Sequence, residues 1–174
     1  MLRFILCFLM ILFSNSAFAL SDNDRAIIRA TFDQVMLDIK NNNMQGMVAA
    51  SPPEFTRTIH EIFGLDDKTA VKEYEDRLKN GDDSYRILEV SYDLDKIVSV
   101  KTKSNLEYAL IPTQDIVQIT RWRVKGKGTT IALKDGSKWY LVRIDTRVVF
   151  KTLQLLYPDL ADLDMPPNST EILE

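Results

Sequence analysis

The sequence predicts an α+β domain in which N-terminal helices pack on a curved antiparallel sheet, a cone or roll, and a C-terminal helix follows the last strand. Two periodicities, one in each half of the chain, predict this class. Up to Gly81, apolar residues recur at spacings of three and four, the period of an amphipathic helix. After Gly81 they alternate with polar residues, the period of a half-buried strand. Helices gathered before antiparallel strands are typical of the α+β class.

The first expected helix covers residues 22–40. Ser21 is a good capping residue with an acidic residue three positions on. The apolar positions that follow are Ile28, Phe32, Val35, Met36 and Ile39. This helix ends in three asparagines at 41–43, and a second, short helix is expected over residues 44–50.

Two further helices are expected before residue 81. Ser51 can cap a helix and Pro53 is tolerated in a first turn, which favours a third helix whose buried positions are Phe55, Ile59, Ile62 and Phe63. Gly64 can end it in a left-handed conformation. A fourth helix would begin at residues 66–67, with an apolar face of Ala70, Val71, Tyr74 and Leu78.

The second half of the chain predicts a strand meander. Its first strands are "YRILEVSYDL", "KIVSVKT" and "LEYALIP", with turns near residues 95–96 and 104–105. Residues 114–133 hold the rest of one strand, a turn near residues 120–121 and a return strand. Asp135-Gly136 is a strong hairpin turn, and we expect Trp139 in the next strand to face inward.

A last helix is expected after Asp145, which can cap it. Its apolar face is Val149, Phe150, Leu153 and Tyr157, and Pro158 ends it. We therefore expect a single domain over residues 20–160. Residues 161–174 contain two prolines and several acids with little periodicity, which predicts a loosely ordered tail.

Residues 1–19 have the pattern of a signal peptide. Arg3 precedes an apolar run from Phe4 to Phe13, and small residues flank Phe18 at 17 and 19. The apolar run is shorter than the roughly 20 residues that span a membrane. We expect cleavage after Ala19 and a soluble mature protein in the periplasm or outside the cell, without a stable membrane anchor.

The composition limits the partners and the redox chemistry. Cys7 is the only cysteine and lies in the signal peptide, so the mature chain is expected to form no disulfide of its own. Without Arg3 the mature chain keeps 21 basic and 25 acidic residues. This mildly acidic balance gives no general attraction to nucleic acid or anionic lipid. The features together suit a bacterial periplasmic protein.

Several phrases of the sequence resemble a known superfamily. "SPPEFTRTIHEIFGLDDKTAVKEYEDRL", "EYALIPTQ" and "IALKDGSKWYLVRID", followed by a helix that ends in "LLYPDL", are similar to small exported proteobacterial proteins of the nuclear-transport-factor-2-like, cystatin-like superfamily. The resemblance covers most of residues 22–160 and implies a cone-shaped α+β barrel. Members include isomerases, dehydratases and transport factors, so it does not fix an activity. The closing helix departs from the simplest members, which end on a strand.

The candidate catalytic residues are His60 and Asp115. His60 is the only histidine, but it lies off the apolar stripe of its helix, which favours a solvent-facing position. Asp115 interrupts a mostly apolar strand, which suggests either a base inside the cone or a bulge or edge position. The acids and the one histidine form no cluster of useful spacing, so neither a metal nor another cofactor is expected.

The basic run "RWRVKGKG" at residues 121–128 has two readings. It could meet an acidic partner or lipid head groups. Alternation instead places Arg121, Arg123 and Lys125 on one face and Trp122 and Val124 on the other, as in an ordinary half-buried strand, and this is the reading we favour. The glycines at 126 and 128 indicate a bent strand.

The leading hypothesis is a non-enzymatic periplasmic binding or interaction module with a mostly apolar pocket or an open sheet face. The aromatic residues expected to contact a small apolar ligand are Tyr74, Tyr92, Tyr108 and Trp139, with Leu88 beside them. One alternative is an isomerase or dehydratase-like enzyme that uses Asp115 as its base, with His60 as a helper. Another is an inhibitor or assembly factor that binds a protein, or forms a homodimer, through the sheet.

Overall fold

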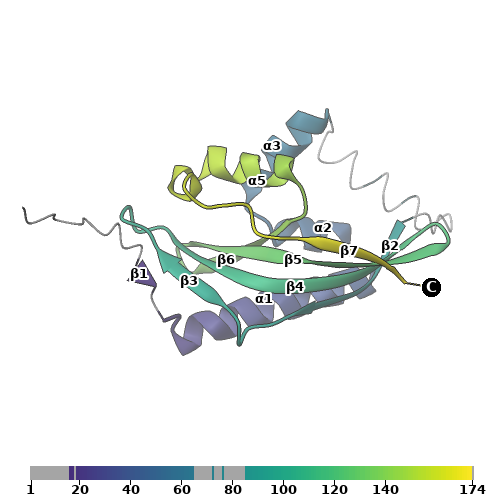
Figure 1. Ribbon diagram of the computed structural model, residues 1–174, viewed down its shortest axis with the longest axis horizontal. Helices are drawn as coiled ribbons and strands as arrows, with labels where there is room; N and C mark the ends of the chain where they lie inside the picture. The colour runs from purple at the N-terminus through teal and green to yellow at the C-terminus, as the bar shows by residue number, and fades with distance from the viewer. Residues whose placement is uncertain (1–15, 18, 65–71, 73–75, 77–84, 174) are drawn as a thin grey trace, which may run out of the picture.

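The computed structural model describes residues 16–17, 19–64, 72, 76 and 85–173. Seven strands form one antiparallel sheet, and helices lie on both of its faces (Figure 1). The predicted α+β class is therefore confirmed, with the helices first, the curved sheet second and a helix after the sixth strand.

Three helices are described over their full length before the main strands. They are α1 (Asp22–Lys40), α2 (Met44–Ala49) and α3 (Pro53–Phe63). The Ser21 hydroxyl accepts a hydrogen bond from the Asp24 amide and so caps α1, as predicted. Gly64 ends α3 with a φ of 65°, a left-handed conformation that glycine adopts without strain. Most of the helix expected after residue 66, Tyr74 included, lies outside the described residues, and its two described residues, 72 and 76, are helical.

Two long central strands organise the sheet. The strands are β1 (Ser16–Ala17), β2 (Tyr85–Tyr92), β3 (Val98–Lys101), β4 (Glu107–Ile119), β5 (Trp122–Asp135), β6 (Lys138–Ile144) and β7 (Ser169–Leu173). β4 and β5 pair along their whole length. β3 and β2 share the outer edge of β4, while β6 and β7 share the outer edge of β5. The turns predicted near residue 120 and at Gly136 are confirmed.

The C-terminal region differs from expectation in two details. The helix α5 (Arg147–Leu156) is capped by Thr146, whose hydroxyl accepts a hydrogen bond from the Val149 amide, and not by Asp145. A short 3₁₀ helix follows at Pro158–Leu160. The segment expected to be loosely ordered contains β7, which pairs with residues 123–127 of β5.

The sheet separates two hydrophobic cores. The α1-side core lies between α1 and one face of the sheet and includes Ile28, Phe32, Ala109, Ile111, Ala132, Trp139 and Leu141. The α5-side core lies on the other face, against α3 and α5, and includes Phe55, Ile131, Leu133, Val142, Ile144, Phe150 and Leu153. Because both faces are covered here, the two sets alternate along β5 and β6.

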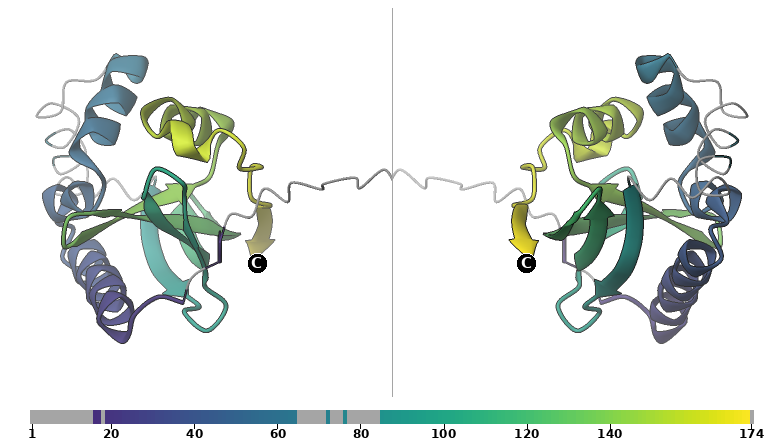
Figure 2. Two further views of the ribbon diagram at one scale, coloured as in Figure 1. Left: turned by 90° about the vertical axis from the view of Figure 1, so that its left-hand side faces the viewer. Right: turned by 90° about the vertical axis from the view of Figure 1, so that its right-hand side faces the viewer.

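The chain passes from one face to the other around the edge of β6. The carbonyl of Ala50 accepts a hydrogen bond from the Leu141 amide at 2.8 Å, and the Ser51 hydroxyl donates to the Leu141 carbonyl at 3.1 Å. Ser51 therefore binds the sheet edge, and the N-cap of α3 is Pro52. Figure 2 shows α1, α2 and α3 following one another around this side of the sheet. No helix among the described residues is long and apolar enough to cross a membrane.

Candidate functional site

A cavity of about 240 Å³ lies on the α1 side of the sheet, next to the α1-side core. We call it the α1 pocket. Its walls come from α1, α2, β2, β4, β5 and β6, and its apolar lining includes Val35, Ile39, Met47, Val90, Val117 and Leu141. A larger and more open groove of about 580 Å³ adjoins it and shares Ile39 and Ile87.

An ion pair lies against this apolar lining. Asp115 on β4 and Arg143 on β6 both line the α1 pocket, and the Arg143 Nη2 atom is 2.6 Å from the Asp115 Oδ1 atom. The Arg143 Nε atom donates to Asp145 Oδ1 at 2.7 Å. The side chains of Asp115 and Arg143 are each 23% exposed, whereas that of Asp145 is 60% exposed. One guanidinium is thus shared between a half-buried and an exposed carboxylate.

Gly126 of β5 makes room for this ion pair, and Gly128 lies under the flexible end of Arg143. β5 runs between β4 and β6, so Asp115 and Arg143 must meet above it. Gly126 is the direct cross-strand partner of Asp115, and a Cβ atom there would stand 2.8 Å from Asp115 Oδ1. A Cβ atom at Gly128 would stand 3.3 Å from Arg143 Nη2. The missing side chains leave the space that the two charged groups fill.

Two threonine hydroxyls complete the polar part of the lining. The Thr113 and Thr130 Oγ1 atoms are 2.7 Å apart, and Thr113 also donates to the Ile111 carbonyl at 3.1 Å. Because a hydroxyl has one hydrogen, Thr130 then donates to Thr113 and keeps its own lone pairs. Both side chains are buried and both line the pocket. The polar groups therefore gather on the sheet, opposite apolar walls from the helices.

Burial and two neighbouring charges set the pKa of the Asp115 carboxylate. It raises the pKa of Asp115 above its ordinary value, the Arg143 charge offsets part of this rise, and the Asp145 charge adds to it. An aspartate in such surroundings is a better proton acceptor than an ordinary surface aspartate. The site can thus bind a hydrogen-bond donor or a cation, and it can accept a proton.

Of the two predicted catalytic residues, only Asp115 lines the pocket. His60 lies on α3, which packs with α5 on the opposite face of the sheet. The structure therefore does not bring His60 and Asp115 together.

The described aromatic residues that were expected to contact a ligand do not line the α1 pocket. Tyr92 stacks on Phe32 with ring centroids 4.3 Å apart and donates its hydroxyl to Asp33. Tyr108 is buried in the α5-side core. Leu88 is 42% exposed, because a bulge between Ile87 and Glu89 shifts the alternation of β2. Tyr74 lies outside the described residues.

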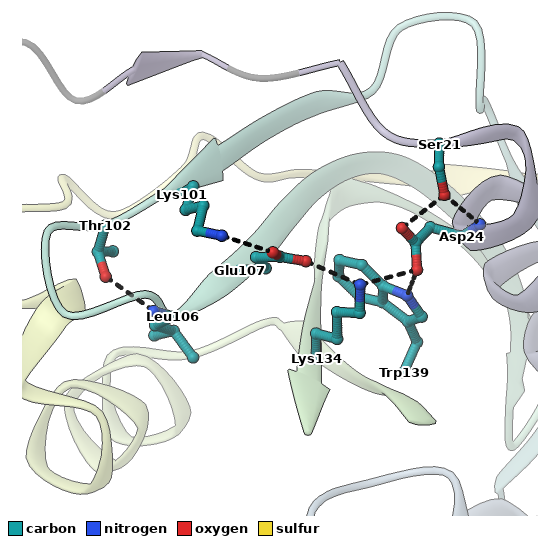
Figure 3. Close-up of polar contacts among 8 residues, drawn as sticks. All are labelled: Ser21, Asp24, Lys101, Thr102, Leu106, Glu107, Lys134 and Trp139. Carbon is teal, nitrogen blue, oxygen red and sulfur yellow. Dashed lines mark hydrogen bonds and ion pairs between the residues drawn. The ribbon is translucent and has the colours of Figure 1, made fainter. Parts of the chain in front are cut away.

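Trp139 is fully buried and belongs to a polar network, not to the pocket. Its Nε1 atom donates to Asp24 Oδ1 at 2.8 Å, and Lys134 Nζ lies 3.1 Å from the same oxygen (Figure 3). Glu107 joins Lys134 to Lys101 at 2.8 and 3.1 Å. The network ties the first turn of α1 to Lys134 on β5 and Trp139 on β6, and through Lys134 to Glu107 on β4, so its role is to hold α1 on the sheet.

The alternation along the strand of residues 138–144 could have placed Arg143 on the pocket side of the sheet. Trp139, Leu141 and Arg143 occupy alternate positions of one strand, so an inward Trp139 carries Arg143 to the same face. Its acidic partner could not be assigned, since Asp115 lies two strands away in space and 28 residues away in the chain.

The remaining predicted features are exposed or form no ligand set. Residues 122–125 pair with β4, but Arg121 lies in the turn before β5, and Trp122 is 47% exposed, with the Arg121 guanidinium 5.0 Å from its ring centroid. Within the part of the chain that the structure describes, no three His, Cys, Asp or Glu side chains are arranged to hold a metal ion.

Comparison of the chain with protein-family models, with curated proteins and with solved structures gives no match.

Proposed function

We propose that the mature chain is a non-enzymatic binding module whose α1 pocket holds a small ligand with an apolar body and a polar head group. The observation that carries this proposal is the half-buried pair Asp115–Arg143 in a cavity whose helix-side walls are apolar. Small-ligand sites combine apolar walls with a few convergent polar groups in this way. A volume of about 240 Å³ is below the usual range for drug-sized compounds, so the ligand is small.

We further propose that the protein is exported, with residues 1–19 removed as a signal peptide, and works in the periplasm or outside the cell. The apolar run 4–13 and the small residues before Leu20 support this, as does the lack of cysteine after Cys7. The order of helices and antiparallel strands supports a relationship to the nuclear-transport-factor-2-like superfamily. Sequencing the N-terminus of the exported protein tests the cleavage: the expected first residue is Leu20, and an N-terminus at residue 1 would contradict export by this signal.

The binding role is tested by titrating 1-hexanol into the mature chain in a calorimeter. We expect saturable binding that Val90→Phe removes, since the larger side chain fills the cavity. Val148→Phe is the matched control, because Val148 is 43% exposed on α5 and lies away from the pocket. Absence of binding, or binding that Val90→Phe leaves unchanged, would refute a ligand role for the α1 pocket.

One observation favours a second candidate function, a proton-transferring enzyme. Asp115 lines the pocket and burial raises its pKa, as is common for a catalytic base. Against it, Arg143 already occupies one carboxylate oxygen. The test is the loss of α-deuterium from deuterated cyclohexanone in ordinary water, followed by NMR. Acceleration by the natural chain and not by Asp115→Asn would support an enzyme, whereas equal background rates would support the binding role.

A further inference from the structure

The charged side chains around the α1 pocket carry an excess of negative charge. Three charged side chains line it: Asp115, Arg143 and Asp145. Arg143 gives its Nη2 hydrogen to Asp115 and its Nε hydrogen to Asp145, at 2.6 and 2.7 Å. A single guanidinium therefore faces two carboxylates, and the formal charge of the set is −1.

The other elements around the pocket add no compensating cation. The described residues of α1 and α2 that line it are all apolar, Ser51 after α2 is uncharged, and the lining residues of β2 are Tyr85, Ile87 and Val90. Lys40 and Arg86 line the adjoining groove and not the α1 pocket. Within the described chain, Arg143 is thus the one cation of the pocket lining.

The excess negative charge should favour some ligand head groups over others. A carboxylate would bring a third negative charge to a guanidinium that already serves two, and would have to displace Asp115 from it. A neutral head group would leave the excess charge in place. A protonated primary amine would neutralise the set, and its three N–H groups could reach the Asp115 carboxylate and the Thr130 hydroxyl. Phe32 and Tyr85 also line the pocket, and aromatic rings attract a cation more than they attract an anion.

We propose that the α1 pocket selects small organic cations, namely primary ammonium compounds with a short apolar body, through an ion pair with Asp115. This inference rests on the binding role proposed above and names its ligand class. The raised pKa of Asp115, caused first by burial and then by the Asp145 charge, agrees with a carboxylate that Arg143 compensates only in part.

The test compares three probes that share one hydrocarbon chain: hexylamine, 1-hexanol and sodium hexanoate, each titrated calorimetrically into the mature protein at neutral pH. We expect hexylammonium to bind at least about tenfold more tightly than hexanoate, with 1-hexanol between them. Asp115→Asn should remove most of the preference for the amine while leaving the affinity for 1-hexanol within about twofold. Asp145→Asn removes the other negative charge of the set and should lower the preference by a smaller factor, because Asp145 is largely exposed and solvent screens its charge.

The outcomes separate the two proposals. Equal binding of the three probes, or a preference for hexanoate, would overturn the cation selectivity and leave the binding role standing. Failure of all three to bind, or binding of all three that survives Val90→Phe, would overturn the binding role itself. The comparison of probes on the natural chain decides the selectivity even if Asp115→Asn fails to fold.

Discussion

Asp115 and Gly126 are direct partners across strands β4 and β5, and a methyl group added at Gly126 would stand 2.8 Å from the Asp115 Oδ1 atom. That distance is well inside van der Waals contact, so the absence of a side chain at Gly126 is what allows Asp115 to reach Arg143 across β5.

We expect Gly126→Ala to destabilise the protein by about 1–3 kcal/mol, because the Asp115 carboxylate must move and gives up its ion pair. Gly128→Ala is the matched control. Its added methyl group meets the flexible end of Arg143 at 3.3 Å, and alanine is the better strand residue, so a change near zero is expected. Chemical denaturation measures both variants, and equal stabilities for the two would contradict the role assigned to Gly126.

The two tryptophans should differ sharply in their contribution to stability. Trp139 is fully buried in the α1-side core, so Trp139→Ala should cost about 3–5 kcal/mol. Trp122 is 47% exposed at the β4–β5 turn, so Trp122→Ala should cost less than about 1 kcal/mol. Urea unfolding measures the loss of stability in each variant, and similar losses would contradict the placement of Trp139 in the core.

Asp24 should make the protein sensitive to acid. Burial raises its pKa, but hydrogen bonds from Trp139, Ser21 and Lys134 outweigh burial and hold the pKa below its ordinary value. A lowered pKa contributes stability above the pKa of the unfolded chain, and the contribution is lost as the pH falls through the folded-state pKa.

The measurement is the free energy of unfolding at about pH 7 and about pH 3. Asp24→Asn should show a smaller loss between these two conditions than the natural chain. Asp22→Asn serves as the control, since Asp22 lies on the same helical turn and is exposed. An unchanged acid loss in Asp24→Asn would show that the network of Figure 3 does not act through this carboxylate.

Strand β7 covers the part of the β5 edge that β6 leaves open. It pairs with residues 123–127, and Ile172 on it is 63% exposed. Deleting residues 168–174 would expose this backbone edge, and we expect the truncated chain to self-associate through it. Sedimentation velocity should show a concentration-dependent dimer absent from Ile172→Ser, which keeps the backbone pairing. A truncated chain that sediments like Ile172→Ser at every concentration would refute edge protection by β7.

The sequence predicted the order and type of the described elements well, because those features depend on local periodicity and turn chemistry. Ser21, Gly64 and the Asp135-Gly136 pair ended or began elements as their backbone preferences require. The bulge after Ile87 was missed, since a single inserted residue leaves the alternation on each side of it intact. β7 was missed because its five residues follow a polar, proline-containing stretch.

The candidate site was predicted only in part, and the reason is topological. Asp115 stood out as an acid within an apolar strand, and it does line the α1 pocket. The roles of Arg143 and Gly126 can be recognised only once β4, β5 and β6 are placed in register. A single sequence does not specify that register. Of the aromatic residues expected to contact a ligand, Tyr92, Tyr108 and Trp139 pack in or against the cores, as large apolar side chains usually do.

The central claim, that the α1 pocket is a ligand site, is tested most directly by NMR of the mature chain with labelled Ile, Leu and Val methyl groups, titrated with 1-hexanol. We predict saturable shifts for the methyl groups of Val35, Ile39 and Val90, which line the pocket. The methyl groups of Val142, Ile144 and Leu153, in the α5-side core on the other face of the sheet, should not shift. Shifts confined to exposed methyl groups such as those of Leu155 and Ile172, or no saturable shift at all, would contradict the claim.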